Sequence, residues 1–349
     1  MKLQKAELAQ KLNKIKGVVP KKTPMSVLQG ILVMDGYLIA NNMELTVKAK
    51  IEGTEGESFI IPERAFDLIN NLPDGEMEIS ATANNTITIK ADKIKNKYQT
   101  MDHTTFPVTE VPEYGSVLTI KAETLLKSMK RVSYAVPAQN SNKIMTSMCL
   151  QALGGQLNFV GLDGHVLACD KVDYEGEFEL LIPKNTVDKL KSLGLSGEVQ
   201  IKHNKTGAVF ITDEFEVYTR LIDGEYFKYQ KMFTDLPLHT VISRMDLLDA
   251  MTRAKMCTEE MSPVKFELDG NSLNLSIKDS TTDYHETVDL QEEITEPLTI
   301  CFNARLVLET LKAFDCDNVG ISFGGPKMPM IVEAEDSDFK TIVLPVNLQ

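Results

Sequence analysis

An internal repeat of about 120 residues is the feature that most constrains the fold of this chain. A pattern of apolar strand, Pro or polar cap, helix, Gly or Asn turn and second strand occurs at residues 58–80, 178–202 and 298–323. Pro62 and Pro183 are separated by 121 residues, and Pro183 and Phe302 by 119. Self-similarity at a fixed period indicates several copies of one structural unit.

Two further markers keep the same spacing. The segments LIANNMELTVKA, FVGLDGHVLACD and LSIKDSTTDYHETV begin at residues 38, 159 and 275, with offsets of 121 and 116. A helix is expected near the start of each unit, at residues 6–18, 122–136 and 244–257. Turn-forming residues at Pro112–Gly115 and Pro237–His239 mark the joints. The chain is therefore predicted to hold three domains, at residues 1–116, 117–240 and 241–349.

Each domain is predicted to be α+β, with two helices packed on antiparallel sheets. The segments TITIKA (residues 86–91) and SLNLSIK (residues 272–278) alternate apolar and polar residues, which is typical of strands with one solvated face. Pro62 and Pro183 stand where a helix begins, a position that tolerates a missing backbone N–H. Trp is absent, so the cores are expected to consist of Leu, Ile, Val and Met.

The distribution of charge points to nucleic acid although the total does not. The net charge is −13, which by itself argues against binding to phosphates. The six expected helices together carry +8, however, so the rest of the chain carries −21. Helices lining a hole would offer cations to DNA, while an acidic exterior would repel stray nucleic acid. Basic helix faces that are merely solvated are the alternative interpretation.

Several function classes are disfavoured by composition and motifs. The N-terminus has no apolar run long enough for a signal peptide, and no segment approaches the length of a membrane span. The five cysteines are odd in number and lack Cys-x-x-Cys spacing, which argues against disulfides and zinc and for a cytoplasmic protein. The five histidines show no metal-ligand spacing. Neither a metal nor another cofactor is expected.

Catalysis and nucleotide binding are not expected either. Asp163, His165 and Cys169 could suggest a nucleophile and base, but Gly164 indicates a tight turn there and no second cluster of His or carboxylates is evident. The Gly pairs at residues 154–155 and 324–325 do not extend to a phosphate-binding loop motif. The chain is therefore predicted not to be an enzyme.

Three segments, in order along the chain, resemble motifs of one known family. GLDGHVLACD (residues 161–170) resembles the motif usually written T-D-G-H-R-L-A, and LIDGEYFKYQKMF (residues 221–233) resembles DGRFPDYRRV. TIVLPVNLQ (residues 341–349) is similar to terminal MPMRL or LPVR endings. The family is that of bacterial DNA sliding clamps, the beta subunits of DNA polymerase III. The resemblance covers the full length of the chain.

The resemblance implies a processivity factor, a head-to-tail homodimer whose six domains close a ring around duplex DNA, independent of sequence. Other implied partners are the DNA polymerase III catalytic subunit, the clamp loader and repair proteins. By position, Tyr98, Met256 and Cys257 resemble apolar contacts of the dimer interface; the alternative is that they belong to the cores of their own domains. The DNA-facing set combines basic residues of the expected helices with two loop positions that the resemblance implies, Lys22 and Gln139. This set is Lys11, Lys14, Lys22, Lys127, Lys130, Arg131, Gln139, Lys189, Lys191, Arg253 and Lys312.

The resemblance also implies an apolar pocket for short partner peptides between the second and third domains. Its positions are Met145, Leu162, Gly164, His165, Val166, Leu167, Phe227, Lys231, Met232, Leu306, Met330, Ile342, Pro345 and Val346. Val166 stands where Arg is common, Phe227 where Pro is common, Leu162 where Thr is usual and Lys231 where Arg is usual. These departures predict a more apolar pocket of different shape. A protein-interaction scaffold that does not bind DNA is the alternative function.

Overall fold

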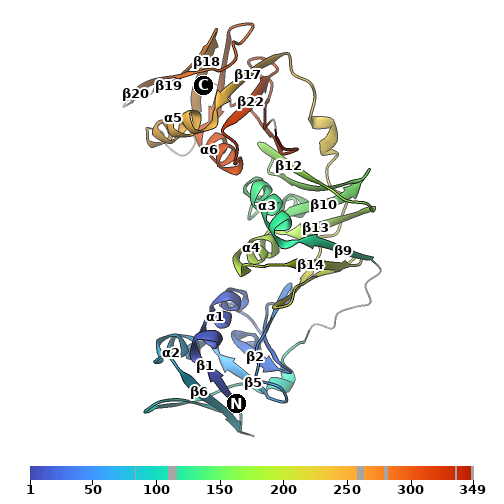
Figure 1. Ribbon diagram of the computed structural model, residues 1–349, viewed down its shortest axis with the longest axis vertical. Helices are drawn as coiled ribbons and strands as arrows, with labels where there is room; N and C mark the ends of the chain where they lie inside the picture. The colour runs from blue at the N-terminus through green and yellow to red at the C-terminus, as the bar shows by residue number, and fades with distance from the viewer. Residues whose placement is uncertain (83, 109–115, 258–262, 279–281, 335, 347–349) are drawn as a thin grey trace. The chain divides into compact units, whose positions relative to one another are not determined.

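The computed structural model describes residues 1–349 except 83, 109–115, 258–262, 279–281, 335 and 347–349 (Figure 1). The predicted turn at Pro112–Gly115 and the last three residues of the C-terminal motif therefore lie outside the described residues. The chain forms two compact units. Unit 1 consists of Met1–Leu126 and Asp188–Leu221, and unit 2 of Lys127–Val187 and Ile222–Gln349. Among the described residues, no helix is both long and apolar enough to cross a membrane.

Unit 1 contains one sheet of eight strands and one of four, and every neighbouring pair is antiparallel. The strand orders are β5-β2-β3-β4-β16-β15-β14-β9 and β1-β6-β7-β8. The strands are β1 (Lys2–Gln4), β2 (Gly30–Met34), β3 (Tyr37–Asn41), β4 (Leu45–Lys50), β5 (Ser58–Pro62), β6 (Glu76–Thr82), β7 (Thr86–Ala91), β8 (Ile94–Gln99), β9 (Ser116–Lys121), β14 (Glu198–His203), β15 (Gly207–Ile211) and β16 (Phe215–Arg220).

Unit 2 repeats this arrangement. Its sheets have the orders β13-β10-β11-β12-β24-β23-β22-β17 and β20-β19-β18-β21, again antiparallel throughout. The strands are β10 (Ser147–Leu153), β11 (Gln156–Leu162), β12 (Val166–Asp173), β13 (Phe178–Pro183), β17 (Leu238–Ser243), β18 (Pro263–Asp269), β19 (Ser272–Lys278), β20 (Asp283–Asp289), β21 (Leu298–Asn303), β22 (Asn318–Phe323), β23 (Met330–Glu333) and β24 (Lys340–Val343).

The six predicted helices are confirmed to within a few residues. They are α1 (Lys5–Ile15), α2 (Phe66–Asn71), α3 (Ala122–Val132), α4 (Lys184–Leu193), α5 (Arg244–Met256) and α6 (Ala304–Ala313), and short 3-10 turns extend α1, α2 and α3. In unit 1 α1 packs against α2, and in unit 2 α5 packs against α6 (Figure 1). Pro62 and Pro183 are the last residues of β5 and β13, directly before a helix, as predicted.

The order of strands confirms the threefold repeat and shows that its copies are joined through their sheets. The first half of each copy supplies four consecutive strands, β2 to β5, β10 to β13 and β18 to β21. The second half supplies the strand before the first helix and the three strands after the second helix. In unit 1 the first half of copy one pairs with the second half of copy two through β4 and β16. In unit 2 the equivalent joint is β12 with β24.

Local sequence explains why these elements form. In β7 the alternating residues Ile87 and Ile89 are fully buried while their neighbours Thr86 and Lys90 are partly exposed. The α6 helix begins after Asn303, whose side-chain oxygen accepts hydrogen bonds from the backbone N–H groups of Arg305 and Leu306. Such a cap satisfies backbone donors that the first helical turn leaves unpaired.

A close approach of helix and sheet in unit 2 depends on a glycine. Gly161 lies in β11, and a Cβ atom at this position would lie 2.8 Å from Val136 Cγ2 and 3.0 Å from the carbonyl oxygen of Val132. These atoms belong to the end of α3 and the turn that follows it. The absence of a side chain therefore lets the end of α3 rest directly on the strand that leads into the GLDGH segment.

We expect Gly161→Ala to destabilise the protein, since its methyl group would push against backbone as well as a side chain. Overpacking of this kind typically costs about 1–3 kcal/mol. Urea unfolding of the variant and the unchanged chain measures this loss. Gly17→Ala is the matched control, because its Cβ would meet only the flexible end of Lys189, at 3.4 Å. Equal stability of Gly161→Ala and the unchanged chain would show that α3 can move away without cost.

Candidate functional site

Part of the predicted peptide pocket lies together on one sheet face of unit 2. Leu162 pairs with Leu167 across β11 and β12, and Leu167 pairs with Ile342 across β12 and β24. Directly paired residues project to the same side of an antiparallel sheet. All three are buried in one apolar cluster, and Phe227 packs against it. The structure therefore brings these four predicted residues together.

Val166 and Met330 do not share that face, which corrects the prediction for them. Val166 pairs with Val343, which in turn pairs with Met330. Strand alternation places this row on the side of the sheet opposite Leu167. Both side chains are 1% exposed and project away from the apolar cluster, so they belong to the core on the other side of the sheet.

The remaining pocket positions surround the cluster with varied exposure. Gly164 has a positive φ of 90° in a tight turn, where the Asp163 carboxylate accepts hydrogen bonds from the N–H groups of His165 and Val166. Exposed positions are Gly164, His165, Lys231 and Met232, and half-buried ones are Met145, Leu306, Pro345 and Val346. The carbonyl oxygen of His165 accepts from the N–H of Leu344, which ties the turn to the C-terminal segment.

The segment that follows β16 lies over the same sheet face. Tyr226 stacks edge-on against Phe227 and Tyr229, with ring centroids 5.4 and 6.5 Å apart. The hydroxyl of Tyr229 donates to Oε1 of Gln151 on β10 at 2.9 Å, which fixes the short 3-10 helix Tyr229–Met232 on the sheet. This aromatic cover holds Lys231 and Met232 at the surface, beside the apolar cluster.

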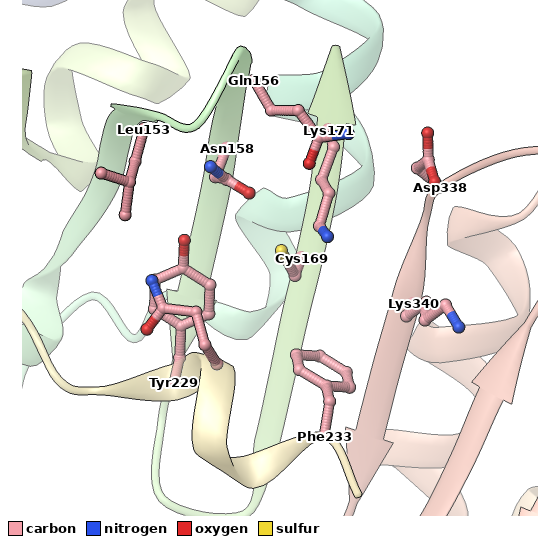
Figure 2. Close-up of a pocket in the computed structure, with 10 residues that line it drawn as sticks. Leu153, Gln156, Asn158, Cys169, Lys171, Tyr229, Phe233, Asp338 and Lys340 are labelled. Atoms are coloured by element: carbon pink, nitrogen blue, oxygen red, sulfur yellow. The ribbon is translucent and has the colours of Figure 1, made fainter. Parts of the chain in front are cut away.

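A cavity of about 310 Å³ lies on this sheet face beside Tyr229 (Figure 2). Its walls come from β10, β11, β12, the 3-10 helix and the start of β24. The lining residues are Leu153, Gln156, Asn158, Cys169, Lys171, Tyr229, Gln230, Phe233, Asp338 and Lys340. Except for Cys169, the sequence analysis had not singled out any of them.

The geometry around Asp163, His165 and Cys169 gives no support to nucleophilic catalysis. The Asp163 carboxylate accepts from backbone N–H groups of its own turn. Burial raises the pKa of the Cys169 thiol to about 12, so it stays protonated near neutral pH and is a poor nucleophile. Within the described ranges, no group of three or more His, Cys, Asp or Glu side chains could hold a metal ion.

Most of the predicted DNA-facing cations have a protein partner. Carboxylate pairs are Lys11 with Glu7, Lys127 with Asp315, Lys191 with Asp188, Arg253 with Glu286 and Lys312 with Glu309. In unit 1 Lys14 lies 5.2 Å from the ring centre of Phe215, and Lys189 donates to the carbonyl oxygen of Lys14 at 3.0 Å. Lys22, Lys130 and Gln139 are exposed, and the two lysines have no carboxylate partner among the described residues.

The position of Arg131 contradicts its place in the predicted DNA-facing set, because the residue is buried. Only 9% of the residue is exposed. Its guanidinium pairs with the buried carboxylate of Asp170 at 3.3 Å and with Asp315, and it lies over the ring of Phe339. Hydrogen bonds from Lys127 and Arg131 lower the pKa of Asp315 to about 2. Arg131 therefore forms internal ion pairs, because its side of α3 faces Asp170 and Asp315, which are distant in the sequence.

The predicted interface residues lie on or near two edge strands, β8 in unit 1 and β20 in unit 2. In unit 1, Tyr98 lies on the edge strand β8, with Arg64 stacked over its ring at 5.6 Å. In unit 2, Met256 at the end of α5 is 80% exposed and Cys257 is partly exposed. Arg253 of the same helix holds Glu286 on the edge strand β20 through two hydrogen bonds.

Comparison with known proteins shows the family. Models of the DNA polymerase III beta subunit match three successive parts of the chain, with the N-terminal domain at residues 1–114, the central domain at 119–228 and the C-terminal domain at 234–347. The chain belongs to the DNA polymerase III beta subunit family.

Named relatives of this beta subunit cover nearly its whole length at low identity. The beta sliding clamp of Chlamydia pneumoniae is 25% identical over 98% of this chain and 97% of the relative, and that of Vibrio cholerae is 23% identical over 99% of both. A Pseudomonas aeruginosa sliding clamp solved with bound griselimycin has a TM-score of 0.93 at 23% identity, covering 100% of this chain and 99% of that one. The Streptococcus pyogenes beta subunit has a TM-score of 0.93 at 19% identity, covering 99% of each chain.

The cavity and the ion pairs of Arg131 and Arg253 were not predicted from the sequence of this chain. A signal for the cavity was present, because Gln156 and Asn158 continue the same alternating row of β11 as Val160 and Leu162. Polar residues on an otherwise apolar strand face indicate a change of environment along the strand. No comparable signal marked Arg131, because Asp170 and Asp315 are 39 and 184 residues away.

We expect Arg131→Met to destabilise this beta subunit by about 3–5 kcal/mol, because it leaves the buried Asp170 carboxylate without its cation. The free energy of unfolding in urea measures the loss. Lys130→Met removes the same charge from the exposed neighbour and is expected to stay within about 0.5 kcal/mol of the unchanged chain. Similar effects from the two substitutions would refute the assigned role of Arg131.

Proposed function

We propose that two copies of this chain form a closed ring that encircles duplex DNA and tethers partner proteins to it. The observation that carries this proposal is the pair of half-sheets that lack a joint within the chain, with the edge strands β8 in unit 1 and β20 in unit 2. The proposed domains are residues 1–116, 117–240 and 241–349, in agreement with the three matched parts. The ring itself would have no catalytic activity and would act in the cytoplasm.

The repeat leaves one sheet joint of each chain incomplete. The three copies define joints of one kind, and two of these, β4 with β16 and β12 with β24, are made within the chain. By equivalence the third joint requires β20 of copy three and β8 of copy one. Exposed edges present unpaired backbone donors and acceptors and favour pairing with another chain. Head-to-tail association of two copies pairs both sets of edges and closes the assembly.

The charges of the two edges are complementary. β8 carries exposed Lys95 and Lys97, whereas β20 carries exposed Asp283 and Asp289 together with Glu286. Opposite charges on neighbouring strands stabilise their pairing, and like charges oppose it. This charge pattern favours the pairing of β8 with β20 over the pairing of β8 with β8 or of β20 with β20. A head-to-tail dimer requires this preference.

Lys95→Glu with Lys97→Glu is therefore expected to weaken dimerisation about tenfold or more, because it places like charges opposite each other. Sedimentation equilibrium over a dilution series gives the dissociation constant. The matched control is Lys205→Glu with Lys327→Glu, two exposed lysines outside both edge strands. Dimerisation that resists the first pair as well as the second would exclude the proposed interface.

Several lysines of the DNA-facing set remain available to phosphates, which supports DNA binding. The pairs of Lys127, Lys191 and Lys312 involve partly exposed side chains, and such surface pairs contribute only about 0–1 kcal/mol each. A phosphate can therefore replace the carboxylate at little cost. Lys22 and Lys130 have no carboxylate partner among the described residues that a phosphate would have to replace. Since a closed ring holds DNA by topology, these contacts can be weak and independent of sequence.

The decisive experiment is retention on DNA of different topology. After loading by the cognate clamp loader and ATP, we expect the protein to stay on a nicked circular plasmid and to leave when the circle is linearised. Equal retention on both forms would favour the alternative, an interaction scaffold that does not encircle DNA.

Lys22→Glu with Lys130→Glu is expected to weaken DNA binding uniformly across sequences and to reduce its salt dependence by about one charge contact per lysine. Fluorescence anisotropy with a DNA duplex at increasing salt measures both effects. Lys205→Glu with Lys327→Glu carries the same change of charge and serves as the control. Lys127 and Arg131 are kept, since they hold Asp315 and Asp170. An unaltered salt dependence would remove Lys22 and Lys130 from the DNA-facing set.

The surface over the apolar cluster of Leu162, Leu167 and Ile342 is the proposed docking site for short peptides of the polymerase, the clamp loader and repair proteins, and the three side chains themselves form its buried base. Phe227 and Met232 at its margin supply further apolar contact. A shallow site of this kind suits affinities near micromolar, about −8 kcal/mol, which allow partners to exchange.

A further inference from the structure

We propose that the cavity in Figure 2 is a second peptide-binding site, which takes a carboxylate side chain and an adjacent apolar side chain from an extended segment of a partner protein. This inference rests on the proposed function in one respect, that partner proteins dock on this sheet face of unit 2. It concerns residues outside the predicted apolar pocket.

The cavity continues the strand rows that form the apolar cluster. On β12 the residues Leu167, Cys169 and Lys171 project to one side, and their partners Ile342 and Lys340 follow on β24. From Leu167 to Lys171 is four residues, or about 13 Å of strand. The sheet face therefore changes over this length from apolar to polar, and the cavity lies at the polar end.

Lys171 supplies an ammonium group that no described carboxylate neutralises. Figure 2 shows its amine directed into the cavity toward Cys169. The neighbouring Lys340 instead pairs with Glu333 at 2.5 Å. Lys171 is half-buried, and a partly desolvated cation is stabilised by an anionic partner. A carboxylate ligand would provide that partner.

The amide side chains in the wall suit a peptide backbone. Asn158 Nδ2 donates to the carbonyl oxygen of Gln151, and Gln230 Nε2 donates to Gln151 Oε1. Each amide nitrogen thus donates one hydrogen bond, while the amide oxygens accept none from the described residues. Oxygens in this state can accept from the N–H groups of an extended peptide.

The remaining walls limit the occupant. Leu153 at the rim is 51% exposed, and Phe233 is partly buried, so both offer apolar contact to a side chain next to the carboxylate. A volume of about 310 Å³ lies at the lower end of the range for ligand pockets. Asp338 lines the same cavity as Lys171, and Lys340 is paired with Glu333, so the lining suits a single negative charge better than a polyanion. These features favour a short peptide segment over a nucleotide or a DNA backbone.

The test uses the full-length protein and two fluorescein-labelled hexapeptides, Gly-Ser-Leu-Asp-Gly-Ser and the same sequence with Asn in place of Asp. We expect the Asp peptide to bind about fivefold more tightly in anisotropy titrations, the factor that a partly exposed ion pair provides. Lys171→Met should abolish this preference, and Lys171→Arg should keep it. Lys205→Met, an exposed lysine in unit 1, is the matched control and should also keep it.

Equal binding of the two peptides, a preference that survives Lys171→Met, or no binding at millimolar protein would each overturn the second site. Loss of the preference in Leu162→Asp but not in Lys171→Met would place the peptide in the apolar cluster and would likewise overturn it. Retention of Lys171→Met on nicked circular DNA is measured in parallel and is expected to equal that of the unchanged chain. Failure of the second site therefore stays distinguishable from failure of the ring.

Discussion

Backbone pairing between half-sheets of different repeats is the interaction on which the rest of this structure depends. The pairs β4 with β16 and β12 with β24 each complete an eight-stranded antiparallel sheet from two four-stranded halves. Two joints between half-sheets are made in this way, whereas a chain of three repeats must leave one half-sheet at each end without its joint. An unpaired edge costs little in water but invites association. Assembly is thus a consequence of the repeat number and of the way in which the copies join.

The same constraint explains how charge is distributed. The edge strand β20 is acidic, and Arg253 of α5 holds its Glu286 in place through two hydrogen bonds. This cation, expected on sequence grounds to face DNA, also organises a sheet edge. Arg131 has a comparable structural role, since the cost of burying Asp170 unpaired far exceeds the gain from one more phosphate contact. Cations therefore fall into two classes, separated by the burial of their carboxylate partners.

Much of the local structure could be predicted from sequence, because it depends on short-range patterns. The alternation around Ile87 and Ile89 identified β7, and Pro62 and Pro183 marked the ends of strands before helices. The threefold spacing gave the repeat. Which half-sheet pairs with which could not be predicted, because alternation defines the faces of a strand but not its neighbour. The sheets consequently join residues that the predicted domain boundaries assign to different copies.

For the candidate site, the predicted residues that the structure brings together are those in one row across neighbouring strands. Leu162, Leu167 and Ile342 lie side by side because their registers coincide. Val166 directly precedes Leu167 in the motif but points to the other side of the sheet, which a motif written as a string of letters cannot show. Long-range partners such as Asp170 for Arg131 were equally hidden, since no local pattern encodes them.

The departures from the family motif therefore act on two different parts of the molecule. Val in place of Arg at position 166 lies in a buried row with Val343 and Met330, so its effect is on core packing. Leu162 and Phe227 lie in or against the apolar cluster and enlarge its hydrophobic surface. A more apolar cluster binds apolar side chains with less discrimination, because methyl-sized differences contribute only about 1–3 kcal/mol. If partners dock here as proposed, selectivity among them would come from polar groups nearby, and on this sheet face these are the exposed residues of the GLDGH turn and the polar end of β11 and β12.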